Sequence, residues 1–298
     1  MVKAADFIFD VIAESLSVYW ESLRRTWRVV LAVMLPLNAV IVLVILQTSS
    51  RFSDSFVRFS RLVFGIVAFV AVTRAAWRAV AGPTDEARIQ GGFASAVGRA
   101  FLTEALVLSI LCAYTFVSLA GIAYFVPRAC ALLSVEGAAD AARTVLVFVY
   151  AAGIPVLVAR WLLAVTLSSL SGTCGFRAMG ASVALLKGRM AKGLLFAAWA
   201  VLVASALAFL PRLAAFIGFR HPFTDSTPVT WAWAAVMTLA GTLSDVAVLF
   251  IPVAFAVYAR RLGEPVSADI RLPRRTVIAL SLAGFALALA WEIFSPMF

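Results

Sequence analysis

The chain has 298 residues, of which 63% are hydrophobic and 13% are charged, and its mean hydropathy is +1.01. Soluble globular domains carry about 25% charged residues, so this composition excludes that class. The apolar residues occur in runs long enough to cross a bilayer, which predicts an all-α, polytopic helical transmembrane bundle. The net charge of +10 comes from basic residues beside apolar runs, a placement that favours lipid headgroups over nucleic acid as partners.

Residues 4–25 are predicted to form an amphipathic helix on the membrane surface, because their apolar and acidic residues follow the helical period. The apolar side carries Ile8, Val11, Ile12, Leu16, Tyr19 and Leu23, and the acidic side carries Asp6, Asp10, Glu14 and Glu21. A first span is expected between Arg28 and Arg51, which enclose 22 uncharged residues with Pro36, Leu37 and Asn38 as an interruption.

The second span is expected over residues 59–78, where the apolar stretch is short. Only 12 residues separate Arg61 from Arg74. Crossing about 30 Å of hydrocarbon would therefore require both arginine side chains to extend towards the headgroups.

A polar stretch, residues 82–92, ends the second span. A short helix over residues 93–100 should then lead to a third span between Glu104 and Arg128. Four further apolar runs predict later spans, which are residues 144 onward through Pro155, 193–211, 231–258 and 276–293. The pattern predicts six to seven spans, with a six-span membrane domain over residues 1–264. Residues 265–298 would add a basic loop and an additional transmembrane helix.

Residues 174–192 are predicted to form a cationic helix along the membrane surface between two spans. Its apolar stripe carries Phe176, Met179, Val183, Leu186 and Met190, and its basic residues are Arg177, Lys187, Arg189 and Lys192. Such a helix can bind anionic lipids through its cations and its apolar stripe. It could equally dock an ATPase subunit, as the cytoplasmic coupling helix of an ATP-driven permease does.

The basic residues also predict the orientation of the chain in the membrane. If the N-terminus lies in the cytoplasm, the inner segments carry 18 of the 25 lysine and arginine residues. Basic loops stay on the cytoplasmic side. We therefore expect a cytoplasmic N-terminus and, with seven crossings, an external C-terminus.

Three ionisable residues within or beside the spans are candidates for a functional site, since a charge inside a membrane is costly. Asp245 lies about halfway along the run 231–258, where it could bind protons or cations. The alternative is a buried acid paired with Arg160 or Asn38. Glu104 and Arg160 are expected near the inner face, where a structural ion pair is the favoured interpretation.

The sequence offers no constellation for catalysis or for a metal or another cofactor. Cys112, Cys130 and Cys174 form no CxxC pair or Cys/His cluster, so neither a zinc site nor a disulfide framework is indicated. The single histidine, His221, precedes Pro222 in a predicted loop. An enzyme needs a nucleophile, a base and an acid that converge, and the spans supply none.

Several segments together resemble a known family. They are the amphipathic N-terminal helix, the short helix before the third span, PVLVARWLLAV, RAMGASVALLKGR, and Pro252 followed by VYARRLGE. Over residues 4–264 the chain resembles the membrane domain that precedes some bacterial glycerophosphodiester phosphodiesterases, and its standalone relatives. The resemblance implies a six-span membrane fold in the bacterial cytoplasmic (inner) membrane.

The chain departs from that family at two places. Ser171, Gly172 and Thr173 stand where relatives tend to place an acidic residue, and the run 276–293 is additional. The metal-binding carboxylates and histidines of a phosphodiesterase are also absent. We therefore expect a non-enzymatic protein with an accessory, lipid-facing or scaffold role. The alternative is a permease subunit that works with an ATPase partner through the helix 174–192.

Overall fold

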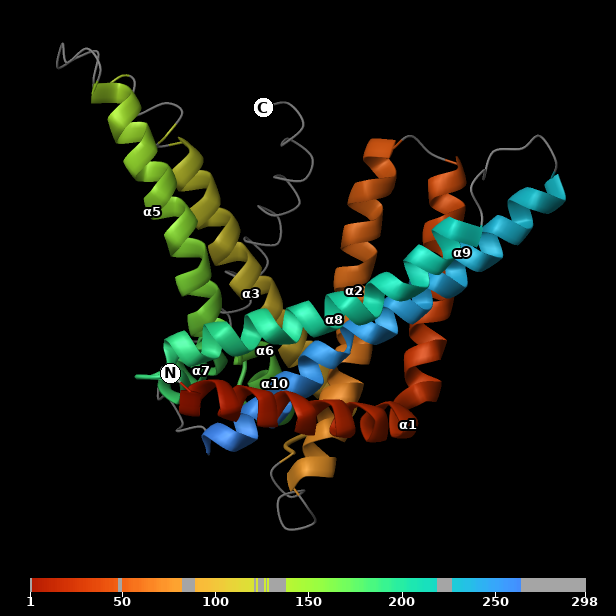
Figure 1. Cartoon of the computed structure of the whole chain (residues 1–298), viewed down its shortest axis with the longest axis horizontal. Helices are drawn as coiled ribbons and strands as arrows, with labels where there is room; N and C mark the ends of the chain where they lie inside the picture. Colours follow the sequence, from red (N-terminus) through yellow and green to blue (C-terminus); the bar gives the residue numbers. More distant parts are fainter. Residues whose placement is uncertain are drawn as a thin grey trace.

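The computed structural model describes residues 2–47, 50–81, 89–120, 122, 126, 128, 138–218 and 227–263. These residues fold into an all-helical bundle with no strand among them (Figure 1). The fold class predicted from composition is confirmed. The basic loop and the apolar run within residues 265–298 lie outside the described residues, as do His221 and Cys130.

The first helix, α1 (Val2–Gln47), joins the predicted surface helix and the first span into one element. Figure 1 shows α1 as two limbs that meet at a sharp bend. Helical geometry continues through Pro36 and Asn38, so the expected interruption is absent. Of the predicted apolar side, Ile8, Val11, Ile12 and Tyr19 are buried. This side packs against the protein rather than serving only as a membrane contact, with the Phe7 ring against Tyr258.

The next two helices are α2 (Ser50–Ala81) and α3 (Phe93–Ala120). The separate short helix expected over residues 93–100 was wrong, because α3 runs on without a break. No glycine or proline lies between Ala100 and Gly121 in the sequence, so the first turns of α3 simply continue.

Arg74 in α2 is buried and bonds to backbone carbonyls. Its side chain is only 7% exposed, and Nη2 donates to the carbonyl oxygens of Gly91 at 2.6 Å and Gln90 at 3.5 Å. Arg99 in α3 donates to the same Gln90 carbonyl at 2.7 Å. The two arginines therefore fix the chain that enters α3, since hydrogen bonds from charged donors are stronger than neutral ones.

Three helices follow in the middle of the chain: α5 (Ala138–Trp161), α6 (Ala164–Leu170) and α7 (Phe176–Leu186). α3 and α5 run side by side (Figure 1), with the rings of Tyr114 and Tyr150 stacked at 5.9 Å. Ser182 of α7 bridges the junction of α5 and α6. Its Oγ accepts from the Leu163 amide at 3.2 Å and donates to the Arg160 carbonyl at 2.9 Å.

The single cationic helix predicted over residues 174–192 was wrong. α7 ends at Leu186, and Gly188 has a φ of +73° in the turn that leads to the next helix. A left-handed backbone conformation ends a helix and favours glycine. The expected apolar stripe is also interrupted, because Val183 is exposed whereas the small residues Ala178 and Ala181 are buried.

The last described helices are α8 (Met190–Gly218), α9 (Thr227–Val248) and α10 (Phe250–Leu262). The sixth predicted span is therefore broken at Leu249, whose amide bonds back to the Val246 carbonyl at 3.1 Å. Pro252 accounts for the break, since it has no N–H to offer the carbonyl of Val248 four residues earlier.

α10 lies at the centre of the core. Every residue from Phe250 to Ala259 except Ile251 is buried. The rings of Phe196 in α8 and Tyr258 in α10 stack at 4.3 Å. Arg261 at the end of α10 bonds Glu14 of α1 at 2.7 Å. Contacts from α8 and α1 thus hold α10 in place, and they position its junction with α9.

Five helical segments among the described residues are long and apolar enough to cross a membrane. They are Phe7–Leu46, Val63–Val80, Phe93–Ser118, Met190–Ala215 and Trp231–Leu262. The prediction was six to seven. α5, which covers the fourth predicted span, is not one of the five. That count covers the described residues only, so a crossing by α5 stays a prediction.

Candidate functional site

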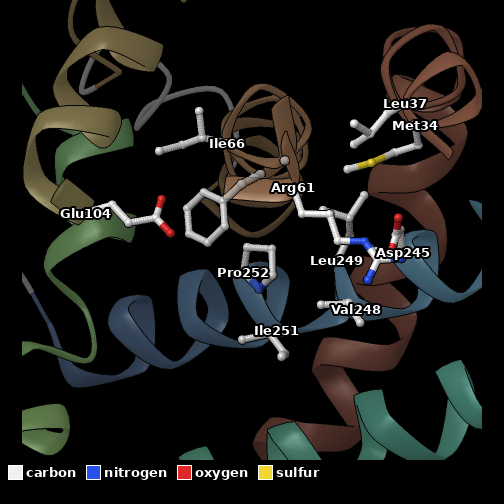
Figure 2. Close-up of a pocket in the computed structure, with 12 residues that line it drawn as sticks. Met34, Leu37, Arg61, Ile66, Glu104, Asp245, Val248, Leu249, Ile251 and Pro252 are labelled. Carbon is white, nitrogen blue, oxygen red and sulfur yellow. Dashed lines mark ion pairs between the residues drawn. The ribbon is translucent and has the colours of Figure 1, made fainter. Parts of the chain in front are cut away.

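A pocket lies beside the junction of α9 and α10, where α1, α2 and α3 also meet it (Figure 2). Its volume is about 270 Å³, close to the lower end of the roughly 300–1,000 Å³ that is usual for ligand sites. The lining residues are Met34, Leu37, Arg61, Gly65, Ile66, Phe69, Glu104, Asp245, Val248, Leu249, Ile251 and Pro252. Nine of the twelve carry no ionisable group, so the wall is apolar with three charged side chains.

Asp245 forms the polar end of the pocket together with Asn38. The Asn38 Nδ2 atom donates to Asp245 Oδ2 at 2.8 Å and to the Met34 carbonyl at 2.9 Å. A Cβ atom on Gly241 would lie 2.6 Å from Asn38 Oδ1. Glycine at that position therefore permits the close approach of α1 and α9 on which the Asn38–Asp245 hydrogen bond depends.

The cation next to Asp245 is Arg61 of α2, not Arg160. Arg61 Nε lies 3.7 Å from Asp245 Oδ1, with the two side chains 38% and 12% exposed. The Nε atom is buried and donates no hydrogen bond within the described part of the chain. The contact is thus an ion pair without a hydrogen bond at Nε.

The helix break beside Asp245 is itself held by a long-range contact. The Val246 carbonyl accepts a hydrogen bond from the Tyr19 hydroxyl at 2.8 Å, in addition to the bond from the Leu249 amide. A carbonyl at the end of a helix lacks its usual donor. The N-terminal limb of α1 supplies that donor, so it fixes the backbone that carries Asp245.

Glu104 does not form the expected ion pair with Arg160, although the structure describes both residues. Glu104 lines the pocket from α3, and its carboxylate points into the pocket opposite Arg61 and Asp245 (Figure 2). Arg160 is exposed on α5. Because α3 begins at Phe93, Glu104 lies inside a segment that is long and apolar enough to cross a membrane rather than at its start.

The four basic residues predicted for one surface helix are divided among three elements. Arg177 lies in α7, Lys187 and Arg189 lie in the turn, and Lys192 lies in α8. All four side chains are exposed. The cations therefore share one end of the molecule without sharing a helix face.

Among the described residues, no group of three His, Cys, Asp or Glu side chains could hold a metal ion. The arrangement in the pocket is suited to binding, since it combines apolar contacts with a few charged groups. Sequence reasoning identified Asp245, Asn38 and Glu104 but did not place Arg61 at the site. One signal could have placed Arg61 there. It lies in the predicted second span, where only 12 residues separate it from Arg74, too few to cross a membrane.

The comparisons with known proteins give a family and no relative of established activity. A family model described as a domain of unknown function (DUF8558) matches residues 95–255, more than half of the chain. The match includes Glu104 and Asp245, whereas Asn38 and Arg61 precede it. No curated protein and no solved structure matches the chain. The protein is a helical membrane protein, and it belongs to the DUF8558 family.

Proposed function

We propose that this protein is a non-enzymatic membrane protein with an accessory, lipid-facing role, which holds an amphipathic molecule in the pocket beside the α9–α10 break. The observation that carries the proposal is the composition of the pocket wall. Arg61, Glu104 and Asp245 are set among apolar side chains, so the pocket offers both a polar end and a hydrocarbon surface. Binding sites in membrane proteins are often built beside such broken helices.

The protein resides in the bacterial cytoplasmic (inner) membrane with its N-terminus in the cytoplasm. Two observations support this part of the proposal. The first is that the topology predicted from the sequence puts 18 of the 25 basic residues in cytoplasmic segments, since basic loops stay cytoplasmic. The second is the resemblance of residues 4–264 to the membrane domain of bacterial glycerophosphodiester phosphodiesterases.

The exposed residues Arg177, Lys187, Arg189 and Lys192 contact anionic lipid headgroups. Replacing all four with glutamine should weaken this contact, because each basic residue contributes about 1 kcal/mol near an anionic surface. Hydrogen exchange of residues 176–192 in nanodiscs with and without phosphatidylglycerol measures the effect. The anionic lipid should slow exchange in the original protein and have no such effect in the quadruple variant.

Two single variants on α8 provide a matched control. Lys192 and Arg212 are both exposed, and about 30 Å of helix separates them at 1.5 Å per residue. Lys192→Gln should reduce the protection by anionic lipid, whereas Arg212→Gln should leave it unchanged. Equal protection in the quadruple variant would contradict the lipid contact. Protection that appears only when a co-purified ATPase is present would favour the permease interpretation instead.

Filling the pocket tests the central proposal. A Cβ atom on Gly65 would meet nothing within 4 Å, and Gly65 lines the pocket. Gly65→Leu should therefore occupy the cavity without a clash at the backbone. We expect the variant to purify folded, with the amphipathic molecule that accompanies the original protein reduced several-fold in mass spectrometry of the extracted lipids.

Gly98→Leu is the control for this experiment. Gly98 lies on α3 away from the pocket lining, and a Cβ atom there also meets nothing within 4 Å. The lipids that accompany Gly98→Leu should equal those of the original protein. If Gly65→Leu retains the same molecules in the same amount, the pocket does not hold them and the proposal is wrong.

A further inference from the structure

Glu104 is set apart from the other two charged groups of the pocket. Its carboxylate points into the cavity from α3, across from Arg61 and Asp245 (Figure 2). Asp245 has Asn38 and Arg61 as partners. Glu104 has no hydrogen-bond or ion-pair partner among the residues that the structure describes.

The ionisable groups of the pocket are therefore unequally paired. Arg61 and Asp245 offset each other, because their side chains form an ion pair. Glu104 remains as the third ionisable group, and an isolated carboxyl in apolar surroundings takes up a proton rather than stay charged unless a cation joins it. A cation that enters the pocket would supply that partner.

The wall between Glu104 and Arg61 favours a cation that carries a hydrocarbon group. Ile66 and Pro252 lie between the two charged ends in Figure 2, and Phe69 also lines the pocket. Aliphatic side chains offer contact to an alkyl chain, and aromatic rings attract ammonium groups. A small hydrated metal ion would find no such match, since hard cations prefer several oxygen ligands.

An anionic headgroup fits the same arrangement less well. It would have to compete with Asp245 for Arg61, whose charge is already offset, and Glu104 offers it no positive charge. We propose that Glu104 is the headgroup site of the pocket and that it binds the ammonium group of an alkylammonium ligand whose chain lies along Ile66 and Pro252. This inference rests on the proposed function, in which the pocket holds an amphipathic molecule.

Thermal-shift titrations in a maltoside detergent test the inference with octylammonium chloride and sodium octanoate as probes. Octylammonium should raise the melting temperature of the original protein in a saturable manner, and octanoate should not. Glu104→Gln should raise the half-saturating concentration of octylammonium on the order of tenfold or more, since it removes one partner of a charge pair. Glu21→Gln is the matched control, because Glu21 is exposed and pairs with Arg25 at 2.8 Å.

A second measurement does not depend on the variant. Dicyclohexylcarbodiimide reacts with carboxyl groups in apolar surroundings, and peptide mass spectrometry locates the product. Octylammonium should protect Glu104 from this reagent in the original protein, and octanoate should not. Equal labelling with and without octylammonium would overturn the proposal even if Glu104→Gln failed to fold.

The outcomes separate the two proposals. If Gly65→Leu loses its accompanying lipid but Glu104→Gln binds octylammonium as well as the original protein does, the pocket holds a ligand whose head is not at Glu104. Stabilisation by octanoate equal to that by octylammonium would also overturn the assignment of a cation. If Gly65→Leu keeps both its lipid and its response to octylammonium, the proposed function fails as well.

Discussion

Replacing Asp245 with leucine should lower the free energy of unfolding by about 3 kcal/mol. Loss of one partner from a buried ion pair costs about 3–5 kcal/mol, because the other charge is left uncompensated. The lower end applies here, since Arg61 is 38% exposed and lies 3.7 Å from the carboxylate. The hydrogen bond from Asn38 is lost in the same variant. Thermal unfolding in detergent should show a melting temperature lower by several degrees.

The double variant Arg61→Leu/Asp245→Leu isolates the cause of that loss. Removing both charges leaves no unpaired ion, and apolar replacements of a buried pair are often neutral or stabilising. The double variant should therefore recover most of the stability that Asp245→Leu loses. Asp10→Leu is the control for a surface acid and should change stability by no more than about 0.5 kcal/mol. Additive losses for Arg61 and Asp245 would show that the two residues do not interact.

Gly241→Ala should destabilise the protein by about 1–3 kcal/mol, the usual cost of overpacking a close contact. The added Cβ would lie 2.6 Å from Asn38 Oδ1 and 3.2 Å from its Cγ. Asn38 is also bonded to the Met34 carbonyl and to Asp245, so its short side chain has little freedom to move. The variant should separate α1 from α9 at the polar end of the pocket.

Two comparisons test this explanation by thermal unfolding. Gly98→Ala meets open space and should be neutral or stabilising by up to about 1 kcal/mol, since alanine is the better helix former. In an Asn38→Ala background the atom that clashes is gone, so Gly241→Ala should cost much less there. An unchanged cost in that background would place the strain elsewhere in the helix pair.

The helical class and the acidic candidates could be predicted because they depend on local composition. Runs of apolar residues show where helices cross a membrane. A carboxylate within such a run is a candidate site residue regardless of how the helices pack. Asp245 was identified in this way, and Asn38 was one of the two partners considered. Both residues lie near the middle of their runs, which places them at similar depth.

Arg61 was missed because its partner is distant in the sequence. The pair joins positions 61 and 245, and which helices become neighbours depends on the packing of the whole bundle. Arginine side chains near the end of a span commonly extend to the headgroups, and the sequence interpretation assigned Arg61 to that environment. In the structure Arg61 pairs with Asp245 and Arg74 bonds to backbone carbonyls.

Helix boundaries were the other source of error, and each had a local cause. The residues after Ala100 contain no breaker, so α3 continued and carried Glu104 into the bundle. Gly188 adopts a left-handed conformation, which divided the predicted cationic helix. Pro252 interrupts the helix close to Asp245, although Trp231–Leu262 still forms one segment long and apolar enough to cross a membrane. A glycine or a proline marks a possible break, but the packing around it decides whether the helix ends there.

The contacts of the N-terminal limb of α1 have a consequence for biosynthesis. Tyr19 bonds Val246, 227 positions later, and Glu14 bonds Arg261, 247 positions later. At about 5–20 residues per second, the ribosome needs roughly 10–45 s to make the chain between Tyr19 and Val246. During that interval the two groups that bond Tyr19 and Glu14 have not yet been made. An early segment of the chain thus docks against the last of the described helices, and these contacts form only after α9 and α10 have been made.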